Sequence, residues 1–179
     1  MNKIRVATTW LDGCSGCHMS ILDMDEKLLE IAPYLDIVYS PYVDTKEFPQ
    51  NVDLSIVEGA ISTDHDLAMI KKIRANSKLI LGLGDCAITG NISAMKNLFG
   101  SEAVLKRGYF DLVDINDAKE YPSKIVPKLL DKVLPLHEVI KLEYFLPGCP
   151  APADAIYELI KAIIEGKEID IHKFTRFGK

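Results

Sequence analysis

Short apolar runs alternate along the chain with segments whose apolar residues recur at helical spacing. The apolar runs predict five strands, at residues 4–11, 36–42, 52–57, 78–83 and 139–146. The helical spacing predicts three helices, with apolar stripes over residues 21–31, 67–73 and 156–164, and a weaker helix over 93–98. Strands that alternate with helices predict an α/β fold of the flavodoxin-like type: a doubly wound, mostly parallel sheet with helices on both faces.

One domain accounts for nearly all of the 179 residues. The predicted flavodoxin-like domain covers residues 1–166, and Gly166 stands where the last helix needs a C-terminal cap. Between about 100 and 135, prolines interrupt short mixed segments and predict an irregular excursion outside the sheet. Residues 167–179 are expected to form a C-terminal arm.

Composition indicates a globular protein and argues against nucleic acid and membrane as partners. With 48% apolar and 26% charged residues, the chain should bury a core without disulfides. A net charge of −5 and the lack of a basic run argue against nucleic acid as a partner. The sequence shows no apolar run long enough for a membrane span and no export signal, which predicts a cytoplasmic protein. Thiols stay reduced there, so the cysteines are available for chemistry.

Every cysteine in the chain closely follows a predicted parallel strand. Cys14 and Cys17 follow the first strand, Cys86 follows the fourth, and Cys149 follows the fifth. Because parallel strands end at the same edge of a sheet, these four thiols should converge where such folds bind ligands. The alternative is that they are four ordinary core cysteines.

Glycines accompany these cysteines in turn-forming sequences. Gly13 and Gly16 lie on either side of Cys14, Gly148 precedes Cys149, and Gly59 follows the third strand. Glycine lets backbone N–H groups approach an anionic ligand such as an iron–sulfur cluster. We therefore expect these four glycines to line a cofactor.

Three chemistries use cysteines in related patterns. One Cys-x-x-Cys pair with two distant single cysteines favours an iron–sulfur cluster, since structural zinc sites usually show two closely spaced pairs. Cys14 and Cys17, between a strand and a helix, also fit a dithiol–disulfide oxidoreductase, although that reading leaves Cys86 and Cys149 without a role. The oxidoreductase and a zinc-stabilised interaction module remain the alternatives.

Four motifs, taken in order, resemble the small subunits of nickel–iron hydrogenases. They are Cys14-x-x-Cys17, Val57-Glu58-Gly59-Ala60-Ile61, Gly84-Asp85-Cys86-Ala87 and Pro147-Gly148-Cys149-Pro150. The resemblance is strongest to the short small subunit of the NAD-reducing, or bidirectional, soluble enzymes. It implies one 4Fe-4S cluster held by all four cysteines, and a large subunit that carries the nickel–iron site. FMN is a second cofactor that some members are described as holding.

The resemblance implies an electron-transfer subunit of an H2:NAD+ oxidoreductase that is not catalytic alone. Electrons would pass between the large subunit and flavin/iron–sulfur diaphorase subunits, because the twin-arginine leader and additional cluster ligands of membrane-linked relatives are not found in this sequence. The related quinone-reducing subunit of respiratory complex I has adjacent cysteines in its first motif. Here Ser15 and Gly16 separate them, which disfavours a quinone-side role.

Three residues near the cysteine motifs have competing interpretations. The resemblance gives Glu58 a place in a proton or water path between subunits, and the alternative is a solvated loop carboxylate. His18 follows Cys17, and we expect it to face water at a helix start rather than to contact a cluster sulfur. Trp10 is expected to be a core or interface aromatic rather than a flavin-stacking residue.

Overall fold

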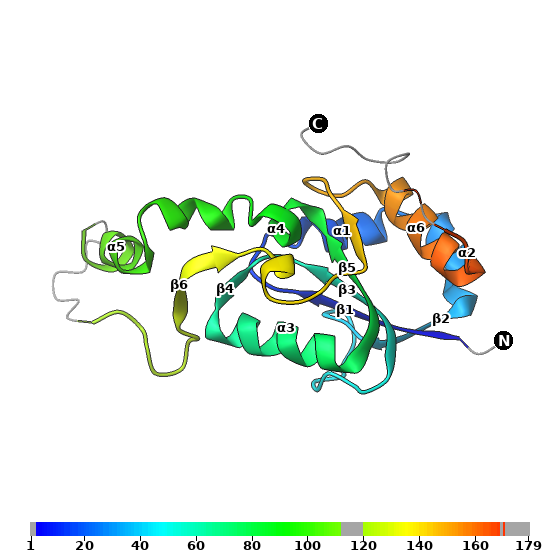
Figure 1. Ribbon diagram of the computed structural model, residues 1–179, viewed down its shortest axis with the longest axis horizontal. Coiled ribbons are helices and arrows are strands. Elements are labelled where there is room, and N and C mark those ends of the chain that lie inside the picture. The colour runs from blue at the N-terminus through cyan, green and yellow to red at the C-terminus, as the bar shows by residue number, and fades with distance from the viewer. Residues whose placement is uncertain (1–2, 112–119, 169, 171–179) are drawn as a thin grey trace.

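The computed structural model of the chain describes residues 3–111, 120–168 and 170. Its centre is a five-stranded parallel sheet in the order β2-β1-β3-β5-β7 (Figure 1). The strands are β1 (Ile4–Trp10), β2 (Leu35–Tyr39), β3 (Val52–Glu58), β5 (Ser77–Leu83) and β7 (Tyr144–Leu146). Because β4 lies outside this sheet, the five strands follow the flavodoxin-like order 2-1-3-4-5, and the predicted fold class is confirmed.

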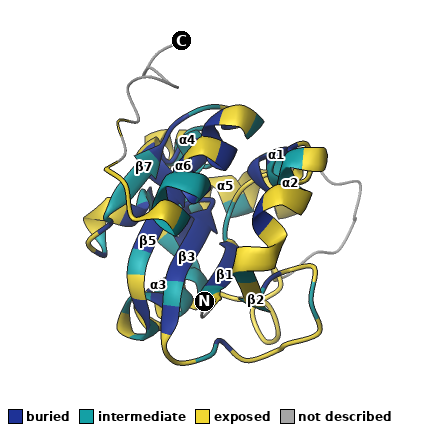
Figure 2. Ribbon diagram, turned by 90° about the vertical axis from the view of Figure 1, so that its right-hand side faces the viewer, coloured by how far each residue is buried: buried dark blue, intermediate teal, exposed yellow. Residues whose placement is uncertain are grey.

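Helices cover both faces of the sheet, and Figure 1 shows α3 on the opposite side from α1, α2 and α6. They are α1 (Gly16–Leu22), α2 (Glu26–Ile31), α3 (Asp64–Asn76) and α6 (Ala153–Glu165). Side chains of β5 alternate between the two cores: Leu81 joins the core under α6, and Ile80 joins the core over α3. In Figure 2 the buried residues therefore run along β1, β3 and β5.

Two predicted elements are shorter than their apolar patterns suggest. The stripe over residues 21–31 belongs to two helices, α1 and α2, because Asp25 adopts a positive φ of 48° that ends helical geometry while Met24 turns into the core. The strand predicted at 139–146 is paired only at Tyr144–Leu146. A 3-10 turn at Leu136–Glu138 precedes it, and Ile140 is buried by packing rather than by pairing in the sheet.

The region predicted as an irregular excursion does lie outside the five-stranded sheet, but it is not wholly irregular. It contains α5 (Ser101–Lys106), a π-helix (Arg107–Asp111) and β6 (Leu129–Leu134), which pairs antiparallel with β4 (Ile61–Thr63). The weak helix over 93–98 is a 3-10 helix, Ser93–Leu98. Residues 112–119, and most of the predicted arm over 167–179, lie outside the described residues.

The last helix confirms its sequence pattern. α6 runs from Ala153 to Glu165 and ends at Gly166, whose φ of 65° accommodates the left-handed cap. In the part of the chain that the structure describes, no helix is both long and apolar enough to cross a membrane.

Candidate metal centre

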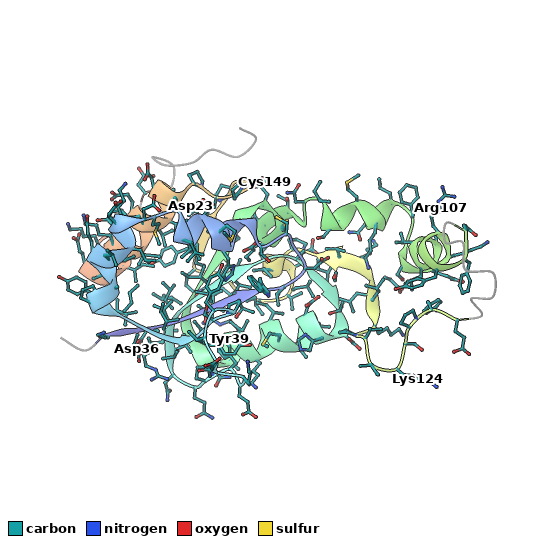
Figure 3. The ribbon with its side chains drawn as sticks, turned by 180° about the vertical axis from the view of Figure 1, so that it is seen from behind. Asp23, Asp36, Tyr39, Arg107, Lys124 and Cys149 are labelled. Carbon is teal, nitrogen blue, oxygen red and sulfur yellow. The ribbon has the colours of Figure 1, made fainter. Side chains whose placement is uncertain are left out.

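All four cysteines lie at the carboxyl-end edge of the parallel sheet, as the strand pattern predicted. Cys14 is in the loop after β1, Cys17 is in the first turn of α1, and Cys86 is in the first turn of α4 (Gly84–Thr89). Cys149, labelled in Figure 3, lies between β7 and α6. All four are free thiols; Cys17 is buried, Cys86 is half-buried, and Cys14 and Cys149 are exposed.

The buried thiol of Cys17 lies within electrostatic reach of two others. Its pKa is raised to about 12, chiefly by burial and to a smaller extent by the negative charges of Glu58, Cys86 and Cys14. A hydrogen bond involving the backbone of Ala151 opposes this rise. A neutral thiol is therefore strongly favoured at Cys17 when no metal is bound.

The thiol of Cys86 links this group to the fourth cysteine. Burial raises its pKa, a hydrogen bond from Asn91 lowers it, and the charges of Cys14 and Cys149 raise it. Each thiol thus interacts electrostatically with at least one other, although Cys14 and Cys149 lie 135 positions apart in the sequence. The structure therefore brings the predicted ligand residues together.

The chemistry of four thiols fits a group that takes sulfur ligands. Cysteine thiolates hold iron–sulfur clusters and also structural zinc ions. Among the described residues, no group of three or more His, Cys, Asp or Glu side chains that could hold a metal ion is found.

Gly84, which stands in the third cysteine motif, contacts the first cysteine loop, and the sequence did not predict this contact. At its φ of 82°, a Cβ atom would lie 2.3 Å from Cys17 Sγ and 3.4 Å from the carbonyl oxygen of Gly148. Any side chain at this position would displace the Cys17 sulfur. Its position directly before Asp85-Cys86 was visible in the sequence, but its contact with the first cysteine loop depends on the fold.

The four predicted glycines are found around the same edge. Gly13 packs against Gly59, where a Cβ at Gly13 would lie 3.4 Å from Gly59 Cα. A Cβ at Gly16 would lie 3.2 Å from Cys14 Sγ, and Gly148 occupies a tight turn with φ of 139°. Their cofactor-lining role stays a prediction.

Glu58 is buried, with only 2% of its surface exposed, so its interpretation as a solvated loop carboxylate is wrong. Its carboxylate accepts hydrogen bonds from the backbone N–H groups of His18, at 2.9 Å, and Cys17, at 3.3 Å. Its Oε2 also lies 2.5 Å from His18 Nδ1. Glu58 therefore fastens the first cysteine loop to the end of β3.

The expectation that His18 faces water is also wrong, because its side chain is fully buried. Glu58 supplies a partner for Nδ1, and the rings of Trp10 and Tyr42 lie edge-on at 5.3 and 6.0 Å from the imidazole. Among the described residues, Nε2 has no hydrogen-bond partner. Trp10 itself is 41% exposed, so it covers His18 and is not a core residue.

Two further side chains contact the cysteine loops and were not foreseen. Asp85 Oδ1 accepts a hydrogen bond from the backbone N–H of Gly148 at 2.8 Å. Asn91 Nδ2 donates to Cys149 Sγ at 3.5 Å. Both residues lie close to Cys86 in sequence, but the identity of their partners could not be deduced from spacing.

Comparison with known proteins places this geometry in a family. Residues 14–163 match the model of the family described as NADH ubiquinone oxidoreductase, 20 Kd subunit. The chain is 34% identical over 177 residues to the NAD-reducing hydrogenase HoxS subunit delta of Cupriavidus necator, covering 94% of this chain and 82% of that protein. It is 41% identical over 167 residues to a subunit of the vhu F420-non-reducing hydrogenase of Methanocaldococcus jannaschii, covering 92% of this chain and 57% of that one.

The chain spans only 56–60% of the length of four F420-non-reducing hydrogenase subunits that it matches. Among solved structures, one chain of an NAD+-reducing [NiFe]-hydrogenase in the H2-reduced state superposes with a TM-score of 0.93 at 30% identity, covering 98% of this chain and 99% of that one. A [NiFeSe]-hydrogenase chain from Dm. baculatum shares the fold, with a TM-score of 0.59 at 17% identity, covering 92% of this chain and 63% of that one. The resemblance to hydrogenase small subunits is thereby confirmed.

Proposed function

The chain belongs to the family of the 20-kDa subunit of NADH–ubiquinone oxidoreductase, and on that premise we propose that it is the electron-transfer small subunit of a nickel–iron hydrogenase. In this role its four cysteines hold one 4Fe-4S cluster, and the chain makes no product alone. Bound there, the cluster supplies a one-electron redox centre. The observation that carries the proposal is the convergence of four free thiols, from three strand ends, at one edge of the sheet.

The chain's own residues would bind this group, orient it and exclude water from one side of it. Cys17 lies on the buried side of the site, whereas Cys14 and Cys149 lie on the exposed side. Glu58 holds the first loop, and Gly84 leaves the space that the Cys17 sulfur occupies. The site is therefore buried on the side of the core and exposed to solvent on the side where a partner could approach.

We propose the nickel–iron large subunit as the partner on that open side. Large apolar side chains stand exposed beside the cysteine loops, among them Met19 next to the Cys17 turn and Ile92 next to Asn91. A partner would bury these side chains and exclude water from the exposed thiolates, which strengthens their interaction with the group they hold.

We propose flavin/iron–sulfur diaphorase subunits as the exchange partner for electrons, in a cytoplasmic complex. The support is the likeness in sequence and structure to subunits whose names state that they belong to NAD-reducing hydrogenases. FMN stays a prediction for this chain. A flavodoxin-like fold binds FMN at the β1/β3 switch point, the same edge at which the loop after β1 carries Cys14 and Cys17.

The alternative of a dithiol–disulfide oxidoreductase has less support. That role would use Cys14 and Cys17 and leave Cys86 and Cys149 unexplained, although all four lie at the same edge of the sheet.

The test is metal analysis of the complete complex, purified anaerobically through a tag on this chain. Each of Cys14→Ser, Cys17→Ser, Cys86→Ser and Cys149→Ser should lower iron and acid-labile sulfide relative to the unmodified complex and change the EPR spectrum of the reduced state. Ser15→Ala, in the same loop as two of the cysteines, is the matched control and should leave both unchanged. Unaltered iron and sulfide in all four cysteine variants, or zinc in place of iron, would overturn the proposal.

A further inference from the structure

The loops that carry Cys86 and Cys149 are joined by a reciprocal pair of hydrogen bonds. The backbone N–H of Asp85 donates to the carbonyl oxygen of Gly148 at 2.9 Å. In return, the backbone N–H of Gly148 donates to Asp85 Oδ1 at 2.8 Å. The two residues are 63 positions apart, and each directly precedes a cysteine.

From this pairing we infer that Asp85 is a positioning residue, which sets the separation of Cys86 and Cys149 by holding one loop against the other. The inference rests on the proposed function, because it assigns the two thiols to one cluster. Asp85 acts through the cysteines and does not itself bind iron.

The Gly148 turn leaves its N–H group little freedom to find another direction. At φ of 139°, a Cβ on Gly148 would lie 2.7 Å from both Ala151 Cα and the carbonyl oxygen of Pro150. The backbone of this turn is therefore closely packed on itself. A carboxylate that accepts from its N–H group fixes the position of the whole turn, including Cys149.

The residue before Asp85 also contacts the first cysteine loop. Gly84, the neighbour of Asp85, lies against both Cys17 Sγ and the carbonyl oxygen of Gly148. Three cysteine-bearing loops thus meet around the start of α4. A shift of Asp85 would change the position of Cys86 directly, and those of Cys149 and Cys17 through these contacts.

The site uses one physical device twice. Glu58 accepts backbone N–H groups from the loop of Cys17, and Asp85 accepts one from the loop of Cys149. In each case a carboxylate at or next to the end of one strand restrains the loop that follows another strand. Hydrogen bonds from backbone N–H groups to a carboxylate are stronger than those between neutral groups, which suits them to fixing loop positions.

The side chain chemistry provides a conservative variant. Asp85→Asn keeps a carbonyl oxygen that can accept from Gly148 N–H, whereas Asp85→Ala removes the acceptor and leaves the backbone bond from residue 85 in place. Asp66→Ala is the matched control: Asp66 Oδ2 accepts from the backbone N–H of Thr63 at 2.9 Å in the cap of α3, which carries no cysteine.

The experiment compares these three variants in the complete hydrogenase complex, purified anaerobically. Asp85→Ala should alter the EPR line shape of the reduced cluster, shift its midpoint potential and release iron to a chelator at least twofold faster. Asp85→Asn should restore all three properties to those of the unmodified complex. Asp66→Ala should lower the melting temperature without moving the spectrum or the potential.

Three results would overturn the inference: an unchanged spectrum, potential and iron release in Asp85→Ala, equal changes in Asp66→Ala, or failure of Asp85→Asn to restore them. If Asp85→Ala does not assemble, Asp85→Ser provides the same comparison, because its side chain is too short to span the 2.8 Å contact in the same geometry. If the unmodified complex has no cluster signal that depends on the four cysteines, the proposed function itself fails. An unaffected Asp85→Ala in a complex with that signal refutes only the positioning role.

Discussion

The cysteine edge and the side lobe, which we define as residues 93–111 and 120–134 together with β4, differ in what their hydrogen bonds hold. At the cysteine edge, neighbouring loops are joined by hydrogen bonds through Glu58 and Asp85. In the side lobe, which Figure 1 shows extending away from the main sheet, Asn97 joins the 3-10 helix to β6 through Val133, and large apolar side chains such as Leu98 and Phe99 are exposed. Hydrogen bonds between loops are therefore found where the candidate ligands are, and the side lobe leaves part of its apolar surface uncovered.

The largest expected effect comes from the strand that supports this edge. Leu81 is fully buried in β5, between Ile56 of β3 and Tyr144 of β7. Leu81→Ala should reduce stability by about 2–5 kcal/mol, because it removes buried methyl groups and leaves a cavity. The melting temperature of the complex measures this effect. A loss below about 1 kcal/mol would show that the sheet does not hold the edge as described.

Glu58 tests whether hydrogen bonds matter at the edge as much as packing does. Glu58→Ala leaves two backbone N–H groups and His18 without their acceptor in a buried place, and should cost at least about 2 kcal/mol. Glu58→Gln keeps one oxygen acceptor and should cost less. Thermal melting of the two variants, measured side by side, gives the order. Equal losses would mean that the hydrogen bonds contribute little.

Glu143 makes the stability of the sheet beside β5 depend on pH. Burial raises the pKa of its carboxyl group, but Arg74 and the backbone N–H of Ile80 outweigh burial and hold the pKa below its usual value of 4.5. Since the pKa is lowered in the folded state, this contribution to stability is present above pH 4.5 and is lost as the pH falls through the folded-state pKa. Glu143→Gln should therefore be less stable at pH 7, by about 1 kcal/mol, and the difference should shrink at acidic pH. Melting curves from pH 7 downward would contradict this if the difference stayed constant.

Asn91 should tune the redox centre. Its side-chain Nδ2 donates to Cys149 Sγ, and such bonds favour the reduced, more negative state. Asn91 has a positive φ of 38°, so Asn91→Gly removes the donor without straining the backbone. It should lower the midpoint potential by roughly 20–60 mV, the equivalent of about 0.5–1.5 kcal/mol for one electron. Asn97→Gly, in the 3-10 helix that follows Asn91 and bonded to Val133, is the control for a redox titration. A potential that moves equally in both variants would rule out a direct effect on the sulfur.

The smallest effect is expected in the side lobe. Leu98 is 80% exposed, and Leu98→Ala should change stability by less than about 0.5 kcal/mol. The loss of stability in Leu98→Ala, compared with that in Leu81→Ala under the same conditions, directly tests the contrast between the two regions. Similar losses at the two leucines would remove that contrast.

The same contrast explains what the sequence could predict. β3 and β5 were recognisable because their residues are apolar on both faces, as central parallel strands require. β4 and β6 were not, since a three-residue strand pairs with a segment more than sixty positions away and leaves no local periodicity. The structure of the side lobe depends on pairing between distant segments, and a local stretch of sequence carries no information about such pairing.

At the candidate site, the cysteines were found because each follows a strand, which is a local property of the sequence. The loop-to-loop partners were not found, because Asp85 and Asn91 contact residues 63 and 58 positions away. The burial of His18 was missed for a related reason. A histidine at a helix start is usually solvated, and only the buried carboxylate of Glu58 on another strand makes the enclosed position favourable.

The order of the strands has a consequence for biosynthesis. Cys149 follows β7, which is synthesised after the other four strands of the parallel sheet, whereas Cys14 follows β1, which is synthesised before them. If the four thiols hold one cluster as proposed, a nascent or truncated chain that lacks the final crossover has an incomplete ligand set. A complete set of four thiols would then exist only after β7 has paired with β5.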